Sequence, residues 1–83
     1  MNQQLTKTQA ILGYIQTALL NGRAIAHDEE LLLSGLLDSL AVASLVAEAE
    51  RVGSIKIPPQ DVTITNFATV DTIVAYIEKA GPK

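Results

Sequence analysis

Apolar residues recur every three or four positions in three stretches of the chain, and this spacing predicts three amphipathic helices. We expect the first helix over about residues 3–20, the second over 38–52 and the last over 69–80. Their apolar faces are formed by Leu5, Ile11, Leu12, Ile15, Ala18 and Leu19, by Val42, Leu45, Val46, Ala49 and Val52, and by Val70, Ile73, Val74 and Ile77. Three such faces can bury one another, so we expect a single all-α domain over residues 1–83.

The predicted ends of these helices coincide with residues that cap or terminate helices. Asn21-Gly22 favours a left-handed turn after the first helix, and Gly53 is expected to end the second. Asp38 and Thr69 can cap the second and last helices by accepting hydrogen bonds from free backbone amides. Gly81-Pro82 is then expected to terminate the last helix.

Two connections lie between the predicted helices. Residues 21–37 have no clean period, so we expect a long loop anchored by Leu31-Leu32-Leu33, with room for a single helical turn. Unstructured connections of this length are uncommon and often functional. The chain should be extended just before Pro58-Pro59, and a short helix is expected over about residues 60–67. A strand at Val62-Thr63-Ile64 is the alternative, but the sequence offers it no good partner strand.

The composition limits the chemistry that the chain can perform. Its 83 residues include no cysteine, which excludes disulfides, thiolate nucleophiles and cysteine metal sites. Any thiol chemistry must therefore arrive on a cofactor. The one histidine, His27, cannot build a multi-histidine site, and no loop has the ligand spacing of a hard-cation site, so we predict no metal site.

The charge pattern argues for protein partners rather than nucleic acid. The net charge is −3, which is unfavourable for binding nucleic acid. Residues 24–50 carry six acidic residues and no Lys or Arg, so this part presents a negative field that would attract basic partner surfaces. The alternative is a solvated acidic loop without a partner. The first ten residues contain no signal peptide or membrane span, so we expect a soluble, cytoplasmic protein without membrane insertion.

Asp38-Ser39 is the main candidate site, because it opens a helix at the end of the long loop. The free amides and the positive end of the helix dipole favour a phosphate ester at this position. His27 is the only residue with the resting pKa of a general base, and no spacing links it to Ser39. We therefore predict no catalytic residue and interpret Ser39 as a modification site, although Asp-Ser alone is also an ordinary helix cap.

Several matched segments extend this site into a family resemblance. Asp38-Ser39-Leu40 is similar to the signature at which acyl and peptidyl carrier proteins receive 4′-phosphopantetheine. The other segments that resemble this family are Leu33, Gly35-Leu36-Leu37, Leu45-Val46, Ile55-Lys56-Ile57-Pro58, Asp61-Val62 and Asn66-Phe67-Ala68-Thr69-Val70. The resemblance covers roughly Leu5 to Ile77, and the combined spacing is far more specific than any single segment.

The resemblance implies a small four-helix bundle, with three main helices, a short third helix and a long first loop. It implies that Ser39 bears the covalent arm from coenzyme A, beside Leu40, and that Asp38 caps the helix and is recognised by the transferase. The arm would hold an acyl or aminoacyl group as a thioester, and the chain itself would not be an enzyme. The implied partners are a phosphopantetheinyl transferase, an acyl- or aminoacyl-activating ligase and a downstream transferase or synthase. A monomer suits a carrier that visits several partners.

The second helix departs from the carriers of fatty-acid synthesis, which usually have acidic residues just after the serine on its exposed face. Here Ala41 and Ser44 occupy those positions. The chain is therefore more similar to stand-alone D-alanyl, aminoacyl or specialised acyl carriers of dedicated pathways. The residues predicted to contact partners are Leu40, Ala43, Ala47, Glu48 and Glu50. The alternative is that the alanines are simply good helix formers.

Two other classes of function, an interaction domain and a hydrolase, are alternatives to the carrier. The chain could be an unmodified helical interaction domain that docks a partner through Leu40, Ala43 and Ala47, with Asp38-Ser39 only a cap. A small hydrolase using Ser39 fits poorly, because the sequence offers no convincing base and a domain of this size has little room for a pocket. Replacing Ser39 separates these hypotheses, since only a carrier loses its modification while keeping its fold.

Overall fold

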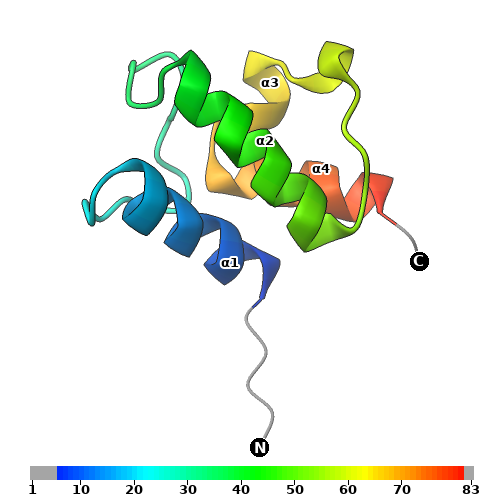
Figure 1. Ribbon diagram of the computed structural model, residues 1–83, viewed down its shortest axis with the longest axis horizontal. Coiled ribbons are helices and arrows are strands. Elements are labelled where there is room, and N and C mark those ends of the chain that lie inside the picture. The colour runs from blue at the N-terminus through cyan, green and yellow to red at the C-terminus, as the bar shows by residue number, and fades with distance from the viewer. Residues whose placement is uncertain (1–5, 82–83) are drawn as a thin grey trace, which may run out of the picture.

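The computed structural model describes residues 6–81 and consists of helices joined by loops (Figure 1). The elements, in chain order, are α1 (Lys7–Tyr14), η1 (Ile15–Leu19, a π-helical segment), α2 (Ser39–Gly53), η2 (Pro59–Asp61, a 3₁₀ turn), α3 (Ile64–Phe67) and α4 (Val70–Ala80). The predicted all-α class, a small bundle with a short third helix, is confirmed. No strand is present within residues 6–81, so the alternative strand at residues 62–64 is wrong.

The first helix differs from its prediction at both ends. Residues 3–5 lie outside the described part of the chain, and Thr6 is already an extended N-cap, so α1 begins at Lys7. The Thr6 hydroxyl accepts a hydrogen bond from the Gln9 amide (3.0 Å), and the Gln9 side chain accepts one from the Thr6 amide (3.1 Å). This reciprocal capping box was not recognised from the sequence.

At its C-terminal end the first helix widens into the π-helical η1. The Leu20 amide donates to the carbonyl oxygen of Ile15 over 2.9 Å, which is the five-residue spacing of a π-helix. Asn21 and Gly22 follow with φ of 55° and 91°. Both lie in the left-handed region, as Asn-Gly predicted, and the chain turns there into the long loop.

The second helix ends one residue later than predicted, and for a different reason. Gly53 is its last residue, while Ser54 takes the left-handed conformation with φ of 54°. A Cβ on Gly53 would lie 2.5 Å from Cγ2 of Ile77, which is closer than real atoms approach. Glycine is therefore required at this position because α2 and α4 pack closely there, and the turn itself belongs to Ser54.

The short helix expected over residues 60–67 is divided into two pieces. Pro59–Asp61 forms the 3₁₀ turn η2 and Ile64–Phe67 forms α3. Thr63 between them is extended and caps α3, because its side chain accepts a hydrogen bond from the amide of Asn66 (3.1 Å). A capping threonine in extended conformation cannot continue the preceding helical turn.

The bundle is closed by α4, which Thr69 caps as expected. α1 packs against both α2 and α4, and α3 packs against α4. The core draws on every α-helix, on η1 and on the long loop: its fully buried residues are Ile11, Ile15, Leu31, Leu45, Ala49, Phe67, Val70, Ile73 and Ile77. Within the described residues, no helix is long and apolar enough to cross a membrane.

Candidate functional site

Ser39 is the first residue of α2 and is exposed to solvent. Asp38 holds this end of the helix twice. Its carboxylate accepts a hydrogen bond from the Ala41 amide (2.8 Å), and its carbonyl oxygen accepts one from Val42 (2.9 Å). The first amides of a helix have no intrahelical partners, so those of Ser39 and Leu40 are directed out of the helix end. The serine hydroxyl therefore lies where backbone donors and the helix dipole both favour an anionic group.

The turn that leads to Ser39 is organised by Glu30. Its carboxylate accepts hydrogen bonds from the backbone amides of Leu32 (3.0 Å), Leu33 (2.7 Å) and Ser34 (2.6 Å). These hydrogen bonds hold the pKa of Glu30 below its usual value, and the one from the Leu33 amide has the largest effect. Gly35 then takes the left-handed conformation with φ of 78°. From the sequence, Glu30 is only part of an acidic run, but in the structure it is the centre of a tight turn.

The leucines of this loop do not act as one anchor. Leu31 is fully buried and its amide donates to the carbonyl oxygen of Ala68 (2.7 Å), but Leu33 is 72% exposed. The second anchor is Leu37, which is 5% exposed and whose amide donates to the carbonyl oxygen of Leu31 (3.1 Å). The prediction that all three consecutive leucines anchor the loop is therefore wrong, because the Glu30 turn directs Leu33 outward.

His27 is bonded to the start of α4. Its Nδ1 lies 2.8 Å from Oδ2 of Asp71, and its carbonyl oxygen accepts a hydrogen bond from the Asp71 amide over 3.1 Å. The hydrogen bond and charge of Asp71, with a smaller contribution from the charge of Asp28, raise the pKa of His27. The side chain thus links the loop to α4, and it is bonded there to Asp71 rather than to Ser39.

The exposed face of α2 begins with Leu40, which is 80% exposed. Ala43, Ser44 and Ala47 continue the exposed face along the helix. Ala41 does not belong to it, because it packs against the core. The face is therefore small, mostly apolar and uncharged over its first two turns.

At the far end of this face, an arginine is more exposed than the acids beside it. Arg51 is 70% exposed, while Glu48, which pairs with the Arg51 guanidinium through both carboxylate oxygens, is only 15% exposed. The Glu50 carboxylate is occupied in accepting a hydrogen bond from the backbone amide of Ile57 (2.8 Å). Both acids expected to contact partners thus have partners within the molecule. No role of Arg51 was predicted from the sequence.

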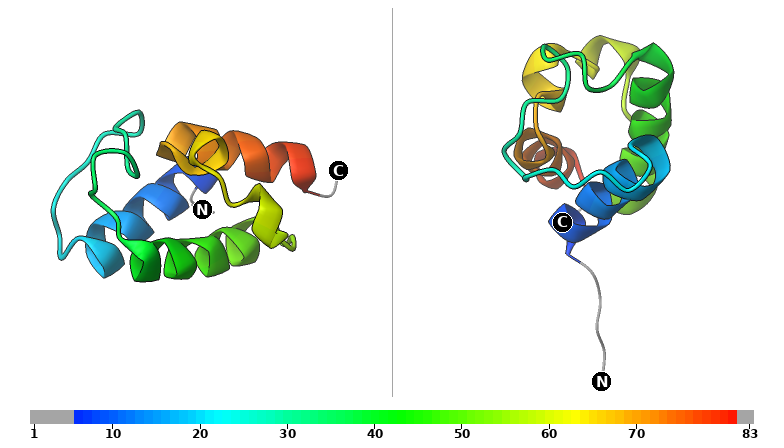
Figure 2. Two further views of the ribbon diagram at one scale, coloured as in Figure 1. Left: turned by 90° about the horizontal axis from the view of Figure 1, so that it is seen from above. Right: turned by 90° about the vertical axis from the view of Figure 1, so that its left-hand side faces the viewer.

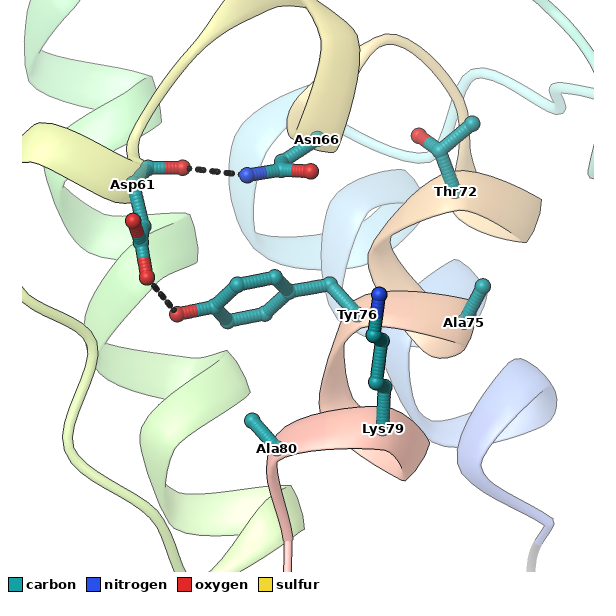
Figure 3. A pocket seen from close by; sticks show the side chains of 7 residues that line it. All are labelled: Asp61, Asn66, Thr72, Ala75, Tyr76, Lys79 and Ala80. Atoms are coloured by element: carbon teal, nitrogen blue, oxygen red, sulfur yellow. Dashed lines mark hydrogen bonds between the residues drawn. The ribbon is translucent and has the colours of Figure 1, made fainter.

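A separate cavity of about 580 Å³ lies between α3 and α4 (Figure 3). The Tyr76 hydroxyl donates to the Asp61 carboxylate over 2.6 Å, and the Asn66 side-chain amide donates to the Asp61 carbonyl oxygen over 2.9 Å. The hydrogen bond to Asp61 is the main cause that raises the pKa of Tyr76 to about 12. The lining includes no residue of α2 or of the long loop, so this cavity is distinct from the surroundings of Ser39.

Comparison with known families identifies the kind of protein to which the chain belongs. The family model described as "Phosphopantetheine attachment site" matches residues 9–77 of the 83. The chain belongs to this family. A search of curated proteins found no match. Domains of this family are the sites of covalent 4′-phosphopantetheine attachment. The family and the cofactor implied by the sequence resemblance are therefore both confirmed. The chain is a phosphopantetheine carrier domain.

The residues around Ser39 fit such a cofactor. A phosphate ester requires an exposed hydroxyl, and the described structure has one at the first position of a fifteen-residue helix. The free backbone amides of that first turn can donate hydrogen bonds to a phosphate. The Asp38 carboxylate accepts its hydrogen bond from the Ala41 amide and so stays bonded to the helix. The junction of the long loop and α2 thus meets the chemical requirements for a phosphate ester.

Proposed function

We propose that the carrier domain bears its arm on Ser39 and holds an acyl or aminoacyl group there as a thioester. The observation that carries this proposal is the position of Ser39: an exposed hydroxyl at the capped N-terminus of α2 in a member of the phosphopantetheine-attachment family. The chain presents the cargo to other enzymes and performs no catalysis of its own. When bound, the arm supplies the thiol that a chain without cysteine lacks.

The roles of the chain's own residues follow from their contacts. Asp38 fixes the first turn of α2, so that the hydroxyl oxygen of Ser39 is presented in a constant direction. Since His27 is bonded to Asp71, the base that accepts the hydroxyl proton during attachment comes from the transferase. The serine oxygen forms a bond to the phosphorus that carries the pantetheine in coenzyme A, the pyrophosphate bond from that phosphorus breaks, and adenosine 3′,5′-bisphosphate leaves.

The partners in this proposal are a phosphopantetheinyl transferase, an acyl- or aminoacyl-activating ligase, and a transferase or synthase that takes the cargo, in a dedicated pathway. They approach through Leu40, Ala43 and Ala47, which are exposed beside Ser39. Because this face has no acidic residue in its first two turns, contact there depends on shape and apolar area rather than on charge. A monomer leaves the face accessible to each partner in turn.

Loading tests the proposal directly. The purified chain is incubated with coenzyme A and a broad-specificity phosphopantetheinyl transferase, and the product is analysed by intact mass and peptide mapping. We expect one phosphopantetheine on Ser39, none in Ser39→Ala, and normal loading in Ser44→Ala, which removes another exposed hydroxyl of the same helix. An adduct on another residue, or no adduct with several transferases, would contradict the assignment and favour the unmodified interaction domain.

A further inference from the structure

The long loop runs around the end of the bundle at which α2 begins (Figure 2, right). It is bonded in turn to the surrounding helices. The Ile25 amide donates to the side-chain oxygen of Gln16 beyond α1 (3.0 Å), and His27 is joined to Asp71 of α4. Leu31 is then joined to the α3–α4 junction through its amide. The loop therefore spans this end from the first helical segment to α4 before it enters α2.

The side chains of the loop occupy the space beneath it. Ile25, Leu31 and Leu37 are 8%, 0% and 5% exposed, so all three point into the core. Leu37 lies two residues before Ser39, and Leu31 is bonded to it through the backbone. Further in, Leu45 and Phe67 are fully buried. The apolar interior next to the attachment serine is thus already filled by the chain's own residues.

We propose that the cargo stays outside the bundle, which assigns this carrier a short or polar cargo, such as an aminoacyl or short acyl group. The inference rests on the proposed function of Ser39. A long hydrocarbon chain that entered the core beneath the loop beside Ser39 would displace Leu31 or Leu37. A shift of the Leu31 backbone would also break the hydrogen bond from its amide to the carbonyl oxygen of half-buried Ala68. A packed core does not absorb added methylenes without such costs.

The cavity between α3 and α4 does not offer another route from Ser39 to the core. Its lining is Asp61, Asn66, Thr72, Ala75, Tyr76, Lys79 and Ala80, all of which lie on η2, α3 or α4. Its wall includes the Tyr76–Asp61 hydrogen bond, which ties η2 to α4. An apolar chain that starts at Ser39 meets Leu37 and Leu31 instead, so the apolar surroundings of the cargo come from the partner enzyme.

The test uses the absence of cysteine from the chain. Ser39→Cys creates a single thiol, which is alkylated with ethyl, hexyl and dodecyl iodoacetamides. We expect the melting temperature to vary by less than about 3 °C across the series, and methyl NMR shifts to be confined to residues near position 39. A Tm that rises with chain length, by about 10 °C or more for a chain that buries several methylenes, would overturn the proposal. Shifts at Leu45 and Phe67 would overturn it as well.

A variant that lacks one of the buried leucines provides a positive control for the test. Leu31→Ala removes a fully buried side chain from beneath the loop, so the same alkyl series in that background should raise Tm with length. Leu37→Ala serves the same purpose if the first variant does not fold. If neither opened variant shows length dependence, the loop is not what excludes the chain, and the proposal fails.

The alkylation series is independent of the carrier assignment. Thiol labelling needs no transferase, so failure to load Ser39 would contradict the proposed function without altering the Tm series. Conversely, a carrier that loads normally on Ser39 but shows length-dependent stabilisation keeps its proposed function and loses the inference about cargo. Repeating the series with acyl-pantetheine groups on Ser39 itself then extends the result to the natural linkage.

Discussion

The loop beside Ser39 and the contact between α2 and α4 at Gly53 are held by different interactions. In the loop beside Ser39, polar side chains make the contacts: half-buried Glu30 accepts hydrogen bonds from three amides, and exposed His27 pairs with Asp71. At the contact between α2 and α4, Gly53 lies against Ile77, where no additional carbon fits. Hydrogen bonds of exposed groups respond to pH and to partners, whereas close packing does not. We therefore expect changes near Ser39 to affect loading most, and changes at Gly53 to affect stability most.

If this comparison is correct, the largest functional effect should come from a change near Ser39. Leu40→Glu places a charge on the first exposed residue of the α2 face, and we expect kcat/KM for loading to fall by about tenfold or more. The Tm should be nearly unchanged, because the side chain is 80% exposed. Transferase kinetics and thermal melts check both parts, with Gln60→Glu as an exposed control outside α2. Equal loss in the control would show that general charge, and not the face, is responsible.

The largest effect on stability should come from a change at Gly53. Gly53→Ala forces a Cβ into Ile77, and we expect the free energy of unfolding to fall by about 1–3 kcal/mol. Urea unfolding followed by circular dichroism measures the change. Gly13→Ala is the matched control, because no atom lies within 4 Å of the added carbon, and alanine there should stabilise the helix by about 0.5–1 kcal/mol. A stable Gly53→Ala variant would remove the packing half of the comparison.

Glu30→Gln should weaken the loop in a pH-dependent way. The amides that bind the carboxylate lower the pKa of Glu30 from 4.5 in the folded state. Its contribution to stability is therefore present above pH 4.5 and is lost as pH falls through the folded-state pKa. We expect faster hydrogen exchange at Leu33 and Ser34 in the variant near neutral pH, and a difference from wild type that shrinks in acid. Exchange rates that match at neutral pH would show that Glu30 does not hold the turn.

The smallest effect is expected at His27, and its pH dependence has the opposite sign. The pKa of His27 is raised above 6.5 in the folded state, so the pairing with Asp71 stabilises the fold below pH 6.5 and is lost as pH rises through the folded-state pKa. NMR titration of the imidazole should give a pKa that returns toward 6.5 in Asp71→Asn. An unchanged pKa in that variant would mean that Asp71 is not the group responsible. Because both side chains are largely exposed, salt should weaken the effect.

Local patterns were enough to predict most of the helices and the candidate serine. The cap at Asp38, the cap at Thr69 and the left-handed turn at Asn21-Gly22 depend on residues within a few positions of one another. Predictions were less accurate where two local signals compete. At residues 60–67 the capping geometry of Thr63 divides the helix, although the helical pattern itself continues across it.

The role of the acidic segment was harder to predict. The segment was predicted either to present a negative field to partners or to be a solvated loop. In the structure, Glu29 contacts Arg23 at 3.5 Å, and Glu30 accepts hydrogen bonds from three backbone amides. The choice of acceptor for a backbone amide depends on the path of the loop, which has no period to reveal it. The same applies to Glu50, whose carboxylate accepts the amide of Ile57 rather than lying on the α2 face.

The sequence by itself determined the helical class, the capped start of α2 and the candidate serine, because each depends on residues close together in the chain. Only the tertiary structure decided that His27 pairs with a residue 44 positions away, that Gly53 is required against Ile77, and that Leu31 and Leu37 fill the interior beside Ser39. The physical reason is that these contacts depend on how the elements are placed against one another. Spacing along a chain predicts which face of a helix is buried, but not which residue it meets.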